Sequence, residues 1–137
     1  MAGFRAIVPA GRGALKMLRL SSWMAMAVGA LLVVGQVVRN RHHLELWPNW
    51  GVDVLAGLIL VYGGWRALRR RSDRSLAAAW AFPAGLFLSA FVSHVQAVQT
   101  AAEGAYQTSE LRIAVIVAGL LAVSVAGVAM SLLGRKT

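Results

Sequence analysis

The sequence contains no cysteine, and only five of its 137 residues are acidic. The absence of cysteine excludes disulfide bonds, thiolate metal sites and the thiol relays of membrane disulfide oxidoreductases. Charged residues of both signs make up only 14% of the chain, whereas 58% is hydrophobic and the mean hydropathy is +0.65. This composition excludes an ordinary soluble domain and indicates a membrane protein.

The few charges that are present are mostly basic, with 14 Lys and Arg residues and a formal net charge of +9. They lie beside apolar segments, where basic side chains face lipid headgroups or fix the orientation of a membrane protein. This distribution favours membrane lipid as a partner and argues against nucleic acid.

Four apolar segments are long enough to cross a bilayer, because about 20 helical residues cover its roughly 30 Å hydrocarbon layer. We predict spans at about 20–38, 49–68, 75–100 and 113–133. A basic leader precedes the first span, but no small-residue cleavage site follows, so we interpret this segment as an uncleaved anchor. The short connections leave no room for an extramembrane domain. The sequence therefore predicts one membrane domain over residues 1–137, an all-α integral membrane protein folded as a compact four-transmembrane-helix bundle.

Basic residues are distributed unequally between the two predicted membrane faces. The leader, the turn at 66–74 and the C-terminal tail together hold eleven Lys and Arg, whereas the other face holds only Arg39, Arg41 and Arg112. Short loops rich in Lys and Arg remain in the cytoplasm. We therefore expect both termini to be cytoplasmic and the protein to lie in a bacterial inner (plasma) membrane.

Small side chains recur every four residues in two of the predicted spans, which places them along one face of each helix. In the third span they are Ala77, Ala81, Gly85, Ser89, Ser93, Ala97 and Ala101. In the fourth they are Ala114, Ala118, Ala122 and Ala126. Such faces allow helices in lipid to approach closely, so we expect these two helices to pack against each other through them.

Polar residues inside the spans gather toward the predicted outer face. Asp53 and His94 are predicted at similar depth, close enough to share a hydrogen bond if their helices are neighbours. Gln36 and Gln96 lie in the same half of the membrane, and Trp50 lies near its boundary. One interpretation is purely structural, with Asp53 bonded to His94.

Two further interpretations of this polar region make it a binding site. The first is a pocket for a quinone headgroup or another small polar ligand, lined by Asp53, His94, Gln36, Gln96 and Trp50. The second is a haem or transition-metal site that uses His42, His43 and His94, since imidazole suits several such metals. The spacing of the histidines follows no regular ligand motif, so the sequence leaves the cofactor undetermined.

The functional prediction follows from the lack of a catalytic constellation and of any extramembrane scaffold that could hold one. We expect a noncatalytic multi-pass protein, an accessory or assembly component that packs with itself or with membrane-protein partners. A quinone-, haem- or metal-binding redox-linked protein is the alternative. A small-solute transporter is a further alternative, which the scarcity of polar residues in the inner halves of the spans disfavours.

Overall fold

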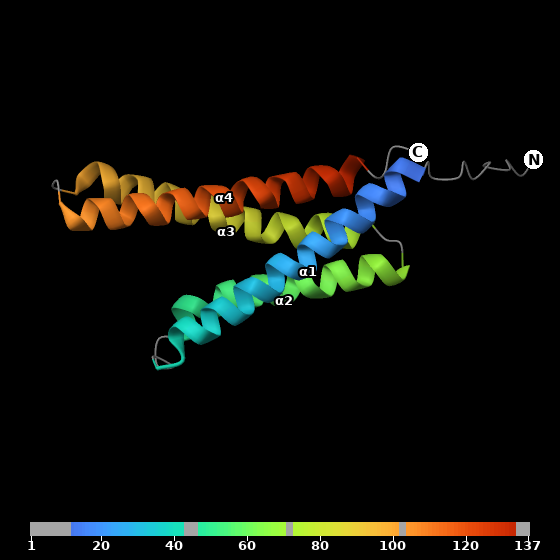
Figure 1. Ribbon diagram of the computed structural model, residues 1–137, viewed down its shortest axis with the longest axis horizontal. Coiled ribbons are helices and arrows are strands. Elements are labelled where there is room, and N and C mark those ends of the chain that lie inside the picture. The colour runs from blue at the N-terminus through green and yellow to red at the C-terminus, as the bar shows by residue number, and fades with distance from the viewer. Residues whose placement is uncertain (1–11, 43–46, 71–72, 102–103, 134–137) are drawn as a thin grey trace, which may run out of the picture.

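The computed structural model describes residues 12–42, 47–70, 73–101 and 104–133. These residues form four α-helices, α1 (Arg12–Asn40), α2 (Trp47–Arg70), α3 (Asp73–Thr100) and α4 (Ala105–Leu133) (Figure 1). Each helix is long and apolar enough to cross a membrane. The predicted all-helical fold with four candidate spans is confirmed.

Two helices begin well before their predicted spans. The prediction placed the first and fourth spans at 20 and 113, whereas α1 begins at Arg12 and α4 at Ala105. The predicted limits were set by the absence of charge, but Lys, Arg and Glu are good helix formers. Lys16 therefore continues α1, and Glu110 continues α4, beyond the apolar segments.

The helices form two antiparallel hairpins, α1 with α2 and α3 with α4, which make the most extensive contacts in the fold. The hairpins meet through α2 and α3 and, less extensively, through α1 and α4. They are close together at the end where α1 begins and α4 ends, which we call the terminal end (Figure 1). They diverge toward the end where α1 ends and α4 begins, which we call the distal end (Figure 1).

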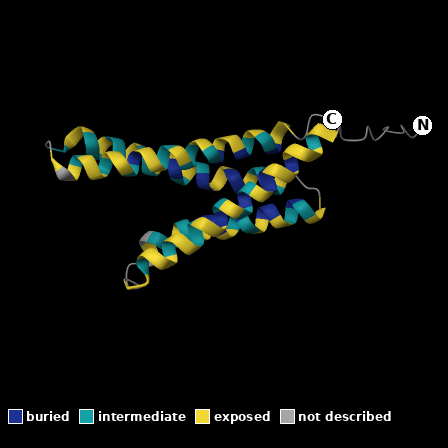
Figure 2. Cartoon of the chain, viewed as in Figure 1, coloured by how far each residue is buried: buried dark blue, intermediate teal, exposed yellow. Residues whose placement is uncertain are grey.

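The buried core lies in the half of the molecule nearer the terminal end (Figure 2). Its members are Leu18, Ala25, Leu60, Ala67, Leu76 and Trp80. In contrast, none of the described residues in 30–55 or 88–113 is fully buried. The predicted bundle is thus tightly packed at one end only, and it is less compact than the sequence suggests.

Small residues explain where the first hairpin packs tightly. A Cβ atom on Gly57 would lie 2.6 Å from the carbonyl oxygen of Gly29, and one on Gly29 would lie 2.5 Å from that of Gly57. Only glycine allows the two backbones to approach this closely. Lipid tails are as apolar as the helices, so close van der Waals contact of this kind replaces hydrophobic burial as the source of association.

The small-residue face of α3 is not where α3 meets α4. Ala81, Gly85, Ser89 and Ser93 are exposed, and a Cβ on Gly85 would meet nothing within 4 Å. The pairing of α3 with α4 is as predicted, but the expectation that this face forms the contact is wrong. Another face of α3, which carries the buried Trp80, Pro83 and Phe87, turns inward instead.

Candidate functional site

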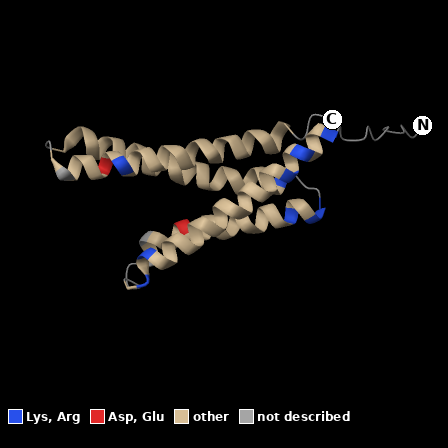
Figure 3. Cartoon of the chain, viewed as in Figure 1, with Lys and Arg blue, Asp and Glu red and all other residues tan. Residues whose placement is uncertain are grey.

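Charged side chains divide between the two ends of the structure, with most of the basic ones at the terminal end (Figure 3). The described basic residues there are Arg12, Lys16, Arg19, Arg66, Arg69, Arg70 and Arg74. Arg39, Arg41 and Arg112 lie toward the distal end, as do the carboxylates of Asp53 and Glu110. The described part of the chain therefore has a strongly basic terminal end and a more mixed distal end.

Asp53 is held by α1, the other helix of its own hairpin. The Gln36 Nε2 atom donates a hydrogen bond to Asp53 Oδ2 at 2.6 Å. Asn40 Nδ2 in turn donates to the side-chain oxygen and to the backbone carbonyl of Gln36, at 2.9 Å each. Because Asn40 donates to the Gln36 side-chain oxygen, it orients the amide so that its nitrogen faces Asp53.

His94 has a separate partner in the second hairpin. Its Nδ1 atom lies 2.6 Å from Glu110 Oε2, and the side chains are 29% and 14% exposed. This contact joins α3 to α4 near the distal end. It corresponds in position to the contact between Gln36 and Asp53, so each hairpin carries an interhelical bond between two polar side chains toward its loop.

The structure does not bring Asp53 and His94 together. Each lies in a different hairpin, and the hairpins diverge toward the distal end (Figures 1 and 3). Sequence reasoning matched the two residues by depth in the membrane, and depth alone does not show which helices are neighbours at that depth. The signal it passed over was the presence of Gln36 and Glu110 as nearer polar partners.

The remaining predicted site residues do not join these pairs. Gln96 is exposed, and its backbone carbonyl accepts a hydrogen bond from Thr100. His42 is exposed and accepts one from Arg41 Nε at 3.0 Å, while His43 lies outside the described residues. Trp50 Nε1 is buried and has no acceptor among the described residues.

Within the described residues there is no group of three His, Cys, Asp or Glu side chains that could hold a metal ion. The predicted haem or metal set of His42, His43 and His94 includes one residue that the structure does not describe. Of the other two, His94 is directed to Glu110, and His42 accepts from Arg41.

A buried polar cluster near the terminal end was not predicted. Trp80 Nε1 of α3 donates to Ser21 Oγ of α1 at 3.0 Å, and Ser21 Oγ lies 3.1 Å from Ser131 Oγ of α4. Ser131 donates to the Gly127 carbonyl at 2.7 Å. Trp80, Ser21 and Ser131 are fully buried. Serines in apolar spans gave no signal, because the members of this cluster come from three different helices.

The pair of Gln36 with Asp53, the pair of His94 with Glu110 and the buried polar cluster around Ser21 have one chemical property in common. Their polar groups bond mainly to one another across helix boundaries. Such bonds stabilise helix packing in lipid, where an unmatched polar group is unfavourable. The arrangement accounts for cohesion of the fold. In comparisons with protein-family models, curated proteins and solved structures, nothing matches this chain.

Proposed function

We propose that this protein is a noncatalytic multi-pass membrane component that assembles through the exposed small-residue face of α3. The observation that carries the proposal is the exposure of Ala81, Gly85, Ser89 and Ser93 along one side of that helix. Small residues at this spacing allow a second transmembrane helix to approach closely. Within the described chain, no helix buries these four residues.

The occupant of the face is a helix of a membrane-protein partner or of a second copy of this chain. Two further features support assembly. The share of each candidate span that is buried within the chain is small, at most 33%. None of the described residues in 30–55 or 88–113 is buried, and these parts of the hairpins therefore leave much of the helix surface free for lipid or protein.

The proposal is tested by substituting Gly85 and comparing it with Gly119. Both glycines have open space at the Cβ position, but Gly85 lies on the α3 face and Gly119 lies on α4. We expect the wild-type protein to be recovered from membranes as a complex in mild detergent. Gly85→Leu should disperse the complex, whereas Gly119→Leu should preserve it.

Two results would contradict the assembly proposal. One is a wild-type protein that is monomeric and free of partners both in detergent and after cross-linking in native membranes. The other is a complex that tolerates Gly85→Leu and Gly119→Leu equally. Circular dichroism of both variants separates loss of assembly from loss of helical structure.

The proposed orientation places the terminal end in the cytoplasm of a bacterial cell and the protein in the inner membrane. Its support is the excess of Lys and Arg at the terminal end. Because the chain lacks cysteine, single thiols can be introduced without background. In intact cells, an impermeant thiol reagent should label Arg41→Cys and should reach Arg70→Cys only after lysis; the reverse pattern would overturn the orientation.

A second candidate function is binding of a small polar ligand near Trp50. The observation in its favour is the buried Trp50 Nε1, which lacks an acceptor among the described residues and lies one helical turn before Asp53. A quinone carbonyl is one acceptor that would suit this donor. Solvent extraction and mass spectrometry should find a bound molecule that Trp50→Phe loses and Trp23→Phe retains; a protein free of any such molecule would exclude this function.

A further inference from the structure

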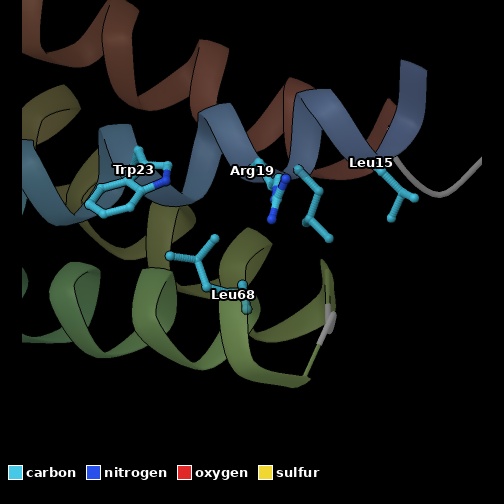
Figure 4. A pocket seen from close by; sticks show the side chains of 6 residues that line it. Leu15, Arg19, Trp23 and Leu68 are labelled. Atoms are coloured by element: carbon cyan, nitrogen blue, oxygen red, sulfur yellow. The ribbon is translucent and has the colours of Figure 1, made fainter. Parts of the chain in front are cut away.

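A groove between α1 and α2 lies at the terminal end. It encloses about 530 Å³ and is lined by Leu15, Leu18, Arg19, Trp23, Ala67 and Leu68. Its volume is within the usual range of small-ligand sites, about 300–1,000 Å³. Figure 4 shows Arg19 and Trp23 extending from α1 and Leu68 extending from α2 toward them.

The groove combines one cation with apolar walls. Leu15, Arg19 and Trp23 are spaced four residues apart and therefore lie along one side of α1. All three side chains are exposed, Trp23 to 63%. No described residue forms a hydrogen bond or an ion pair with the Arg19 guanidinium. The groove thus presents a cation, without a partner among the described residues, beside an exposed aromatic ring.

The position of the groove along α1 matches the boundary of a bilayer. Arg19 is the last charged residue before the uncharged segment that begins at Leu20, and Trp23 lies one turn deeper. Tryptophan favours the zone between headgroups and acyl chains, while a long basic side chain reaches the headgroups. The groove therefore spans the depth at which a phospholipid changes from phosphate to hydrocarbon.

The surrounding charge is complementary to an anionic lipid. Arg12 precedes the groove on α1, Lys16 lies between two of its lining residues without lining it, and Arg69 and Arg70 follow it on α2. Such a concentration of basic residues attracts negatively charged headgroups. An arginine can also bind a phosphate through two parallel hydrogen bonds, and it therefore recognises a phosphate more specifically than a diffuse positive surface does.

We propose that this groove binds one anionic phospholipid, with its phosphate on Arg19 and an acyl chain along Leu68 and Trp23. The lipid fills the space beside the points at which the two helix backbones approach closely, which lie farther into the membrane, at Ser22 with Gly64 and at Gly29 with Gly57. The site is independent of the small-residue face of α3, which lies on a different helix.

The test measures lipid retention by the full-length protein. The protein is reconstituted with equal amounts of phosphatidylglycerol and phosphatidylcholine, extracted in mild detergent and analysed by native mass spectrometry. We expect one retained phosphatidylglycerol. Arg19→Gln should reduce the preference for phosphatidylglycerol about tenfold, because a charge-assisted contact is lost. Lys16→Gln removes the same charge on the same helix without lining the groove, and should change the preference by about twofold at most.

A further variant distinguishes the contribution of the acyl chain to lipid retention from that of the headgroup. Trp23→Ala keeps the charge but removes the largest apolar wall, so it should reduce retention of both lipids together. Equal wild-type retention of the two lipids would overturn the proposal, and so would equal effects of Arg19→Gln and Lys16→Gln. Displacement of the lipid by millimolar glycerol phosphate would assign the site to a free anion and would also overturn it.

Discussion

The indole ring of Trp80 packs directly over the backbone of Gly127, so closely that a Cβ atom at Gly127 would overlap ring atoms Cδ2 and Cε2. The same indole donates its N–H to Ser21 Oγ at 3.0 Å. Trp80 is fully buried, and its ring therefore connects α3 with α4 by packing and with α1 by a hydrogen bond. This contact is one of the points at which the second hairpin is joined to the first helix.

Replacing Gly127 by alanine should weaken this junction. The new methyl group would displace the Trp80 ring and lengthen its bond to Ser21, and overpacking of this kind lowers stability by about 1–3 kcal/mol. The measurement is the unfolding free energy in mixed micelles. Gly119→Ala is the matched control, because it lies on the same helix with no atom within 4 Å of its Cβ position. Equal stability of the two variants would contradict the packing described for Trp80.

The closest contact of α1 with α2 should be equally intolerant of a methyl group. In Gly57→Ala the new atom would meet the backbone oxygen of Gly29, which cannot rotate away as a side chain could. We expect the helices to separate, with a loss of about 1–3 kcal/mol in unfolding free energy. Spin labels at the exposed Leu31 and Leu58 should report a longer mean distance.

Gly35→Ala provides the control for Gly57→Ala, since its Cβ position is open. If both substitutions leave the distance between the labels unchanged, the close approach of Gly29 and Gly57 is not required for the hairpin.

The sequence was sufficient for the number of helices and for most of their limits. Uncharged segments such as the one from Ile113 to Leu133 report the lipid environment directly, because a charge in the hydrocarbon layer is unfavourable. The lateral arrangement of the helices was harder to predict from the sequence. Which face of α3 turns inward depends on the fit of Trp80 against Gly127, and the periodicity of small residues favoured a face that is exposed.

The partners of the polar side chains were likewise hard to predict from the sequence. Asp53 and His94 were predicted at similar depth, but Gln36 and Glu110 lie on the adjacent helix of each hairpin and are nearer. Helices joined by a short loop are neighbours by connectivity alone. Partners within a hairpin could therefore have been preferred from the sequence, whereas the divergence of the two hairpins could not.

Cross-linking should distinguish these pairings. With cysteine absent from the chain, paired thiols can be introduced at positions 94 and 110, or at 53 and 94. A short bifunctional thiol reagent should join the first pair efficiently, because the native side chains lie 2.6 Å apart, and should join the second pair poorly. Native membranes are the appropriate setting. Efficient joining of positions 53 and 94 within one chain would show that the hairpins close at the distal end.

Substitutions of Gln36 and Asp53, which share a hydrogen bond, should have strongly non-additive effects on the unfolding free energy. Gln36→Leu removes the donor and leaves the Asp53 carboxylate unmatched within a membrane span, which should lower the unfolding free energy by about 1–3 kcal/mol. Replacing both residues by leucine removes the donor and the unmatched acceptor together. The double variant should therefore be more stable than Gln36→Leu alone, since an apolar pair of similar volume leaves no polar group unsatisfied.

The wild type, the two single leucine variants and the double variant form a double-mutant cycle. Its control is Gln96→Leu, which removes an exposed amide from the same half of the molecule. Its effect should be within about 0.5 kcal/mol, as is usual for surface positions. The four unfolding free energies of the cycle give the coupling between Gln36 and Asp53 directly. A coupling of zero, with Gln36→Leu no more harmful than Gln96→Leu, would mean that water or lipid headgroups satisfy Asp53 and that its bond to α1 does not stabilise the hairpin.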